Sequence, residues 1–198
     1  MPDRQATAMS LADARLPCIG VVLAGGRSTR MGRDKAMLAW QGRPLLDRQI
    51  DVLRRCGVDA WQISGDRPDY GSVADMQAGL GPLGGLVSVA GAVSGDADLL
   101  VIPVDMPLLG PDLLRRLRLA HAQARCLRYA GHVMPMRLRL DATSREQLAA
   151  LLDQAEPAQR SLRALQRAMD AVELPLDDSE AAQLLDCNTE ASWNEVTR

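Results

Sequence analysis

The residues best suited to chemistry lie in one glycine-rich segment near the start of the chain. Gly25 and Gly26 directly follow an apolar run, and four cations, Arg30 and Lys35 among them, occur within the next nine residues. Glycines let backbone amides approach phosphate oxygens, and successive N–H groups can form an anion-binding concavity. The segment therefore predicts a phosphate-binding loop in which Arg30 and Lys35 offset the charge of a triphosphate. A solvated basic loop is the alternative.

Lys35 is the one lysine among 23 basic residues, since every other is arginine. A compact ammonium group fits close to a phosphate where the wider guanidinium fork does not. This exception lies at the end of the glycine-rich loop, which favours a contact between Lys35 and phosphate over a chance occurrence.

Asp105 is the best candidate for a metal ligand. It follows the apolar run of residues 99–104 at the carboxyl end of a predicted strand, where an unpaired carboxylate would be costly without a cation or hydrogen bonds. Mg²⁺ usually takes one or two protein carboxylates together with substrate phosphates and water, so a sparse acidic site suffices. The alternative is an aspartate that caps the following turn. Asp75 is a second acid, better suited to bind a ribose or to stabilise its own loop.

Other familiar catalytic patterns do not fit. The spacing after Gly26 is not that of a Walker loop, and the G-x-G-x-x-G of Gly79, Gly81 and Gly84 does not follow an apolar strand. Gly81 and Pro82 remain suited to a helix N-terminus that approaches a ligand closely. Covalent catalysis has no support, because no serine, cysteine or histidine has a triad-like context. The four cysteines form no CxxC pair and indicate free thiols rather than zinc.

The hydrophobic pattern of the first half alternates strands and helices. We expect buried strands over 18–24, 59–64 and 99–104, with helices that begin near Pro44, Pro82 and Pro111. This alternation predicts a mostly parallel α/β sheet with helices on both faces. Ligands of such sheets bind beyond the carboxyl ends of the strands. Three loops leave that edge, over residues 25–35, 65–81 and 105–111.

The second half is less regular. Residues 125–140 predict one or two strands, and Pro135 argues against a central position for them. Residues 144–154 and 158–170 predict helices, and 171–176 predict a short edge strand. We expect a single domain over 17–198, with a nucleotide-binding half over 17–110 and an acceptor-side half over 111–198.

Composition restricts the partners and the compartment. The formal net charge is −2, which gives no reason to expect a nucleic acid or an anionic membrane as partner. No apolar run approaches the roughly 20 residues that span a bilayer. Residues 1–16 lack the apolar core of a signal peptide and predict a short N-terminal extension. With unpaired thiols, these features favour the cytoplasm.

Together these features resemble the molybdenum cofactor guanylyltransferase family, within the nucleotidyltransferases built on a Rossmann-like sheet. The resemblance covers about the first 110 residues, and it is carried by four stretches: Leu23 to Lys35, Gly42-Arg43-Pro44-Leu45, Gly81-Pro82-Leu83-Gly84-Gly85 and Pro103-Val104-Asp105-Met106-Pro107.

The resemblance implies an enzyme that uses GTP and Mg²⁺ as reactants. The acceptor would be molybdopterin, usually carrying molybdenum, with molybdoenzyme chaperones as further partners. The terminal phosphate of the acceptor would attack the α-phosphate of GTP and release pyrophosphate. By analogy, the catalytic residues are Lys35, Arg30 and Asp105, and Asp105 is the metal ligand. The nucleotide would be held by Leu23, Ala24, Gly25, Gly26, Lys35, Ser64, Asp75, Gly81, Pro82 and Asp105, and the acceptor by Asn188 and Thr189.

The sequence departs from the family pattern at three places. Ser64 stands where the family often has an asparagine, Met134 precedes Pro135 where a histidine is expected, and Asp186 replaces the first asparagine of a C-terminal motif. Three alternatives remain open. The first is the same chemistry with CTP, although Leu23-Ala24-Gly25-Gly26 resembles the guanine branch. The others are transfer to a sugar or polyol phosphate, and an inactive nucleotide-binding partner protein.

Overall fold

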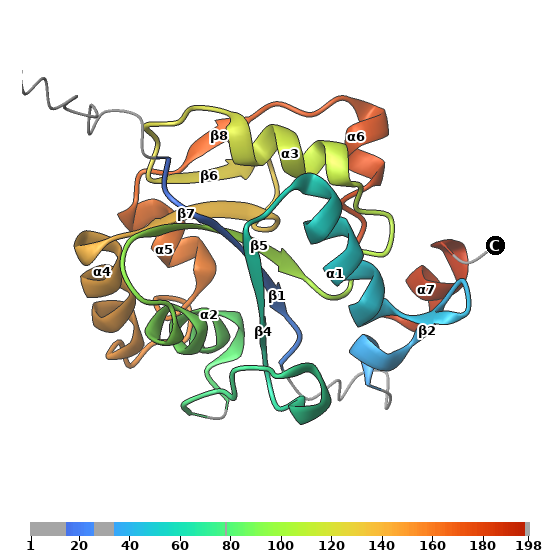
Figure 1. Cartoon of the computed structure of the whole chain (residues 1–198), viewed down its shortest axis with the longest axis horizontal. Coiled ribbons are helices and arrows are strands. Elements are labelled where there is room, and N and C mark those ends of the chain that lie inside the picture. The colour runs from blue at the N-terminus through green and yellow to red at the C-terminus, as the bar shows by residue number, and fades with distance from the viewer. Residues whose placement is uncertain (1–14, 26–33, 78, 197–198) are drawn as a thin grey trace, which may run out of the picture.

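A six-stranded sheet forms the centre of the molecule in a computed structural model that describes residues 15–25, 34–77 and 79–196 (Figure 1). Within this sheet, β7 runs antiparallel to both of its neighbours, and the other strand pairs are parallel. The predicted mostly parallel α/β sheet is therefore confirmed. The strand order is β4 (Ala60–Ser64), β1 (Cys18–Leu23), β5 (Ala97–Pro103), β7 (Met136–Leu140), β6 (Cys126–Tyr129) and β8 (Val172–Leu174). A separate antiparallel pair is formed by β2 (Ala39–Trp40) and β3 (Arg43–Pro44).

Helices cover both faces of this sheet, as predicted (Figure 1). On one face lie α1 (Leu45–Cys56) and α3 (Pro111–Leu119). On the other lie α2 (Gly81–Ala92), α4 (Ala142–Leu152) and α5 (Leu162–Ala168). Two short helices follow β8, namely α6 (Asp178–Ala182) and α7 (Glu190–Val196), which the sequence pattern did not predict. No helix among the described residues is long and apolar enough to cross a membrane.

β5 shows why the predicted strands read as continuous apolar runs. Its side chains alternate between the two faces, so that Leu100 and Ile102 enter the core under α1 and α3. Leu99 and Val101 enter the core under the helices of the other face. A strand buried on both faces needs apolar residues at every position. Asp105 follows this strand by two residues and therefore lies at the carboxyl edge of the sheet.

Local capping residues set the helix boundaries, and two helices begin at other residues than predicted. α1 ends at Gly57, whose φ of 84° is the left-handed conformation that glycine adopts without strain. α4 begins earlier than expected because Asp141 and Ser144 form a capping box. α5 begins later than expected because Ser161 caps it. The edge position of β8 is confirmed.

The expectation that Pro135 keeps residues 125–140 out of the sheet interior is wrong. That segment forms two strands, and both β6 and β7 have a neighbour on each side. Pro135 lies directly before β7, whose first paired residue is Met136. Because proline precedes the strand, its missing N–H removes no hydrogen bond from the ladder.

A buried arginine of β7 ties the sheet to the end of α3. The side chain of Arg137 is 1% exposed, and its guanidinium group donates to the backbone carbonyls of Arg118, Ala120, His121 and Ala124. Burial lowers the pKa of this group from its ordinary value. These contacts hold the turn after α3 at the edge of the sheet opposite the candidate site.

Candidate active site

The three predicted loops leave the same edge of the sheet. β1, β4 and β5 are parallel neighbours, so the segments that follow Leu23, Ser64 and Pro103 emerge side by side. The backbone N–H of Ala24 donates to the carbonyl of Ser64, and that of Val104 donates to the carbonyl of Leu23. This edge is where ligands of open α/β sheets bind.

Lys35 and Asp105 form an ion pair at this edge. The Lys35 Nζ lies 3.0 Å from the Asp105 Oδ2, and it also donates to the Asn188 Oδ1 at 2.5 Å. The Lys35 and Asp105 side chains are only 15% and 19% exposed, which limits screening of the pair by solvent. Three segments that are far apart in the chain thus converge on one ammonium group. The structure brings together the predicted phosphate-binding lysine, metal ligand and acceptor-side asparagine.

The position of Asp105 is fixed by its backbone surroundings. The N–H of Cys187 donates to the carbonyl of Asp105 over 2.8 Å, and the Gln49 Nε2 donates to that of Met106 over 2.7 Å. Among the described residues, the Asp105 carboxylate accepts from Lys35, and no backbone amide of the following turn donates to it. Gly110, rather than Asp105, is the N-cap of α3. The geometry therefore favours a cation partner for Asp105 over a capping role.

Arg67 is a site residue that sequence reasoning missed. Its guanidinium group donates to both carboxylate oxygens of Asp34, over 2.6 and 2.7 Å, and twice to the carbonyl of Ala24, over 3.2 and 3.3 Å. Asp34 caps the one-turn 3₁₀ helix η1 (Lys35–Met37). Arg67 therefore holds residues on both sides of the glycine-rich segment and, through Asp34, orients Lys35. The hydrogen bond from Arg67 lowers the pKa of Asp34.

A second group of predicted residues converges between β1, β4 and α2. The Ser64 Oγ donates to the Asp75 Oδ1 over 3.4 Å. A Cβ at Gly85 would lie 2.2 Å from the Ser64 Oγ, and one at Gly25 would lie 3.1 Å from the Asp75 Oδ2. The two glycines thus allow α2 and the end of β1 to approach Ser64 and Asp75. A Cβ at Gly65 would similarly lie 2.8 Å from the Cα of Gly25.

Leu23 and Ala24, two further residues of the predicted nucleotide site, can offer a ligand only their backbone. The side chains of Leu23 and Ala24 are buried in the two cores, and the N–H of Ala24 is already paired with Ser64. Gly81 and Pro82 form the first turn of α2, and Gly81 has a φ of 63°. Gly26 and Arg30 lie outside the described residues.

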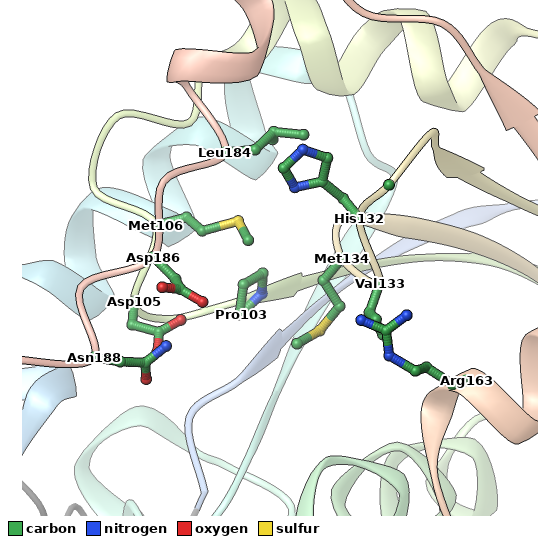
Figure 2. Close-up of a pocket in the computed structure, with 11 residues that line it drawn as sticks. Pro103, Asp105, Met106, His132, Val133, Met134, Arg163, Leu184, Asp186 and Asn188 are labelled. Carbon is green, nitrogen blue, oxygen red and sulfur yellow. The ribbon is translucent and has the colours of Figure 1, made fainter.

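A cavity of about 390 Å³ adjoins Asp105 on the side of the second half of the chain (Figure 2). We call it the acceptor cavity. Its volume is in the range of small-molecule sites. Asp105, Asp186 and Asn188 form one wall, and Arg163 stands on the opposite side. Its full lining is Pro103, Asp105, Met106, Gly131, His132, Val133, Met134, Arg163, Leu184, Asp186 and Asn188.

Two of the three departures from the family pattern lie in this cavity, whereas Ser64 lies beside Asp75 and α2. Met134 and Asp186 both line it, so their side chains shape its surface. Thr189 does not line it. The Thr189 Oγ1 instead accepts from the N–H of Ser192 over 3.1 Å at the start of α7. Asn188 and Thr189 therefore serve the site differently, the first by contact with Lys35 and the second by capping α7.

Cysteine chemistry has no support at this site. All four cysteines are free and buried, as expected from their spacing. Burial, together with the charges of Asp105 and Asp186, raises the pKa of Cys187 to about 11, so its thiol is neutral at physiological pH. Among the described residues, no group of three histidine, cysteine, aspartate or glutamate side chains is arranged to hold a metal ion.

Comparison with known proteins places the chain in a family. Residues 20–172 match the model of the MobA-like NTP transferase domain. The molybdenum cofactor guanylyltransferase of Xanthomonas euvesicatoria is 47% identical over 180 residues, which cover 91% of this chain and 94% of that protein.

Two solved structures share the fold. The molybdopterin-guanine dinucleotide biosynthesis protein A of Archaeoglobus fulgidus has a TM-score of 0.70 at 18% identity, covering 90% of this chain and 96% of that one. The Rv0371c protein of Mycobacterium tuberculosis, in complex with manganese, has a TM-score of 0.64 at 23% identity, covering 91% and 98%. The chain therefore belongs to the MobA-like NTP transferases and, within them, to the molybdenum cofactor guanylyltransferases.

Proposed function

We propose that this protein transfers GMP from GTP to molybdopterin, with or without bound molybdenum, to form the guanine dinucleotide cofactor and pyrophosphate. The observation that carries this proposal is the ion pair between Lys35 and Asp105 at the carboxyl edge of the sheet, directly beside the acceptor cavity. The 47% identity to a molybdenum cofactor guanylyltransferase supports the choice of acceptor. We place the reaction in the cytoplasm.

GTP binds over the first half of the chain. Its phosphates lie against the glycine-rich segment, with Arg30 and the Lys35 ammonium group neutralising their charge. Ser64, Asp75 and the first turn of α2 lie on the side of the ribose and the base. The hydrogen bond between Ser64 and Asp75 orients the carboxylate toward Gly25, where the nucleotide passes.

The residues present suit a magnesium ion. Mg²⁺ binds few protein carboxylates and completes its shell with phosphate oxygens and water. This preference fits the edge of the sheet, where Asp105 pairs with Lys35 and Asp186 lines the same cavity. The fold relative from Mycobacterium tuberculosis was solved in complex with manganese, which is consistent with a divalent cation. Bound at Asp105, Mg²⁺ would neutralise the charge that develops on the phosphates.

The chemistry then requires alignment rather than a strong base. A phosphate oxygen of the acceptor forms a bond to the α-phosphorus of GTP, and the bond from that phosphorus to the α–β bridging oxygen breaks. Pyrophosphate leaves with the electron pair. A phosphate monoester is largely ionised at neutral pH, so its oxygen is already a nucleophile. Lys35, held by Asn188 and Asp105, stabilises the charge on the leaving group.

A thermal shift titration with GTP, CTP, ATP and UTP, each with and without Mg²⁺, tests the nucleotide. A ligand at 100 times its Kd adds about 2.7 kcal/mol of stability, so binding is readily resolved. We expect a Mg²⁺-enhanced shift with GTP, followed by pyrophosphate release when molybdopterin is added. A shift with CTP alone would assign the cytosine form of the reaction. No shift with any nucleotide, and no release of pyrophosphate, would leave an inactive partner protein as the better description.

A further inference from the structure

Two arginines of α5 have no partner among the described residues. Almost every other described arginine donates to a carbonyl, pairs with an acid or stacks on an aromatic ring. The guanidinium groups of Arg55, Arg163 and Arg167 make no hydrogen bond, ion pair or ring contact with the described part of the chain. Within the described residues, unpaired arginines are therefore rare, and two of these three lie on one short helix.

Arg163 and Arg167 lie on the same face of α5, because residues four apart are neighbours on a helix. Leu162 and Leu165 bury the opposite face in the core. Like charges at this spacing destabilise a helix rather than stabilise it. The arrangement does not serve the fold, which favours a role in binding an anion.

The helix is anchored so that these arginines face two adjoining cavities. Gln166 is 4% exposed, and its Nε2 donates to the carbonyl of Val133 over 2.7 Å. This bond fixes α5 against the loop that lines the acceptor cavity. Arg163 lines both this cavity and a groove of about 590 Å³ that we call the α5 groove. The groove is lined by Arg128, Arg163, Gln166, Arg167, Asp170 and Ala171.

The charges around the α5 groove leave an excess of positive charge. Arg128 is offset by an ion pair with Glu173, and Asp170 is the acid that lines the groove. Within this groove, the two unpaired cations Arg163 and Arg167 therefore outnumber the one lining acid, Asp170. In the acceptor cavity, Arg163 stands opposite the acidic wall of Asp105 and Asp186 (Figure 2).

We propose that Arg163 and Arg167 bind an anionic group of the acceptor at the end remote from its reacting phosphate. This inference rests on the proposed function. The reacting phosphate has to reach the α-phosphorus of GTP near Lys35 and Asp105, so the remainder of the acceptor extends across the cavity to the α5 side. An anionic substituent there meets Arg163 and Arg167, neither of which forms an ion pair with an acid of the described residues.

The test compares steady-state kinetics of the intact protein with Arg163→Gln, Arg167→Gln and the double variant. Arg55→Gln is the matched control, because its side chain is also unpaired but lies on α1 and lines neither cavity. We expect the double variant to raise the KM for molybdopterin at least about tenfold, the scale of one charge-assisted contact. The KM for GTP should stay within about twofold, since the site of the nucleotide is unchanged.

Salt dependence separates a contact from a structural effect. In the unmodified protein the KM for molybdopterin should rise with NaCl, and this dependence should be weaker in the double variant. An unchanged KM for molybdopterin in a double variant that still shows the GTP-induced thermal shift would overturn the inference. An equal rise in both KM values would overturn it too. If the unmodified protein transfers no GMP, the proposed function fails first and this inference falls with it.

Discussion

Replacing Arg67 by methionine tests whether the glycine-rich segment is held at both ends. The change keeps much of the side-chain volume but removes four hydrogen bonds, two to Asp34 and two to the carbonyl of Ala24. Asp34 would still cap η1 through the N–H of Ala36, but its carboxylate would lose both hydrogen bonds from Arg67. We therefore expect Lys35 and the start of the glycine-rich segment to move relative to each other.

The expected loss of stability comes mainly from the backbone carbonyl of Ala24, which loses its donor. The pair with Asp34 contributes no more than about 1 kcal/mol, because the Asp34 side chain is 46% exposed and solvent screens it. The carbonyl of Ala24 lies in a buried residue, and leaving it unpaired costs about 1–3 kcal/mol. Together these give about 1–4 kcal/mol, and each kcal/mol lowers the Tm of a domain of this size by about 2–4 °C.

The stability difference should depend on pH in a defined direction. Arg67 holds the pKa of Asp34 below its ordinary value, so the ionised carboxylate stabilises the folded state above that value. This contribution is lost as the pH falls through the folded-state pKa. The variant lacks it at every pH. The gap between the two unfolding free energies should therefore narrow below about pH 4 and remain constant above it.

The decisive measurement is kcat/KM for GTP, which we expect to fall at least about tenfold because the phosphates and Lys35 are no longer aligned. Arg125→Met is the control. Arg125 also pairs with a capping aspartate, Asp141, over 3.1 Å. This pair lies far from the site, and the Arg125 guanidinium group, unlike that of Arg67, donates to no backbone carbonyl of the described residues. It should cost under about 1 kcal/mol and leave the kinetics unchanged. Normal kcat/KM for GTP in a folded Arg67→Met protein would refute the positioning role.

Other variants and reagents test separate parts of the site. Lys35→Ala and Asp105→Ala should each lower turnover at least about 10²-fold, the scale of a preorganised charge contact, and near-normal rates in both would remove the mechanism; Lys35→Arg shows whether charge alone suffices. Gly85→Ala places a Cβ 2.2 Å from the Ser64 Oγ, so it should destabilise the fold by about 1–3 kcal/mol and raise the KM for GTP. In the control variant Gly91→Ala, in the same helix, the new Cβ meets open space, so the stability should be unchanged or higher. Burial raises the pKa of all four cysteines, to about 12 for Cys18 and Cys126 and about 11 for Cys56 and Cys187. A thiol reagent at pH 8 should therefore label the unfolded protein only, and rapid labelling of the native state would contradict the buried positions.

The sequence by itself determined the features that depend on short stretches of chain. Apolar runs followed by glycine or aspartate identified β1 and β5, two of the strands that end at the site, because a strand buried on both faces needs apolar residues throughout. The parallel order of these strands followed from their alternation with helices. Lys35 and Asp105 could be singled out because each stands at a loop that leaves the carboxyl edge of the sheet.

The tertiary structure decided the contacts between distant segments. Asn188 lies 153 residues from Lys35 in the chain, and no local pattern shows that its amide reaches the ammonium group. Arg67 and Arg163 are two of many arginines with no distinguishing neighbours in sequence. What distinguishes them is their surroundings in space. Arg67 donates to the carbonyl of a buried residue and to a half-exposed carboxylate, and Arg163 lines a cavity without a partner among the described residues. The physical reason is that periodicity encodes burial of a face, whereas the partner of a polar group depends on how those faces pack together.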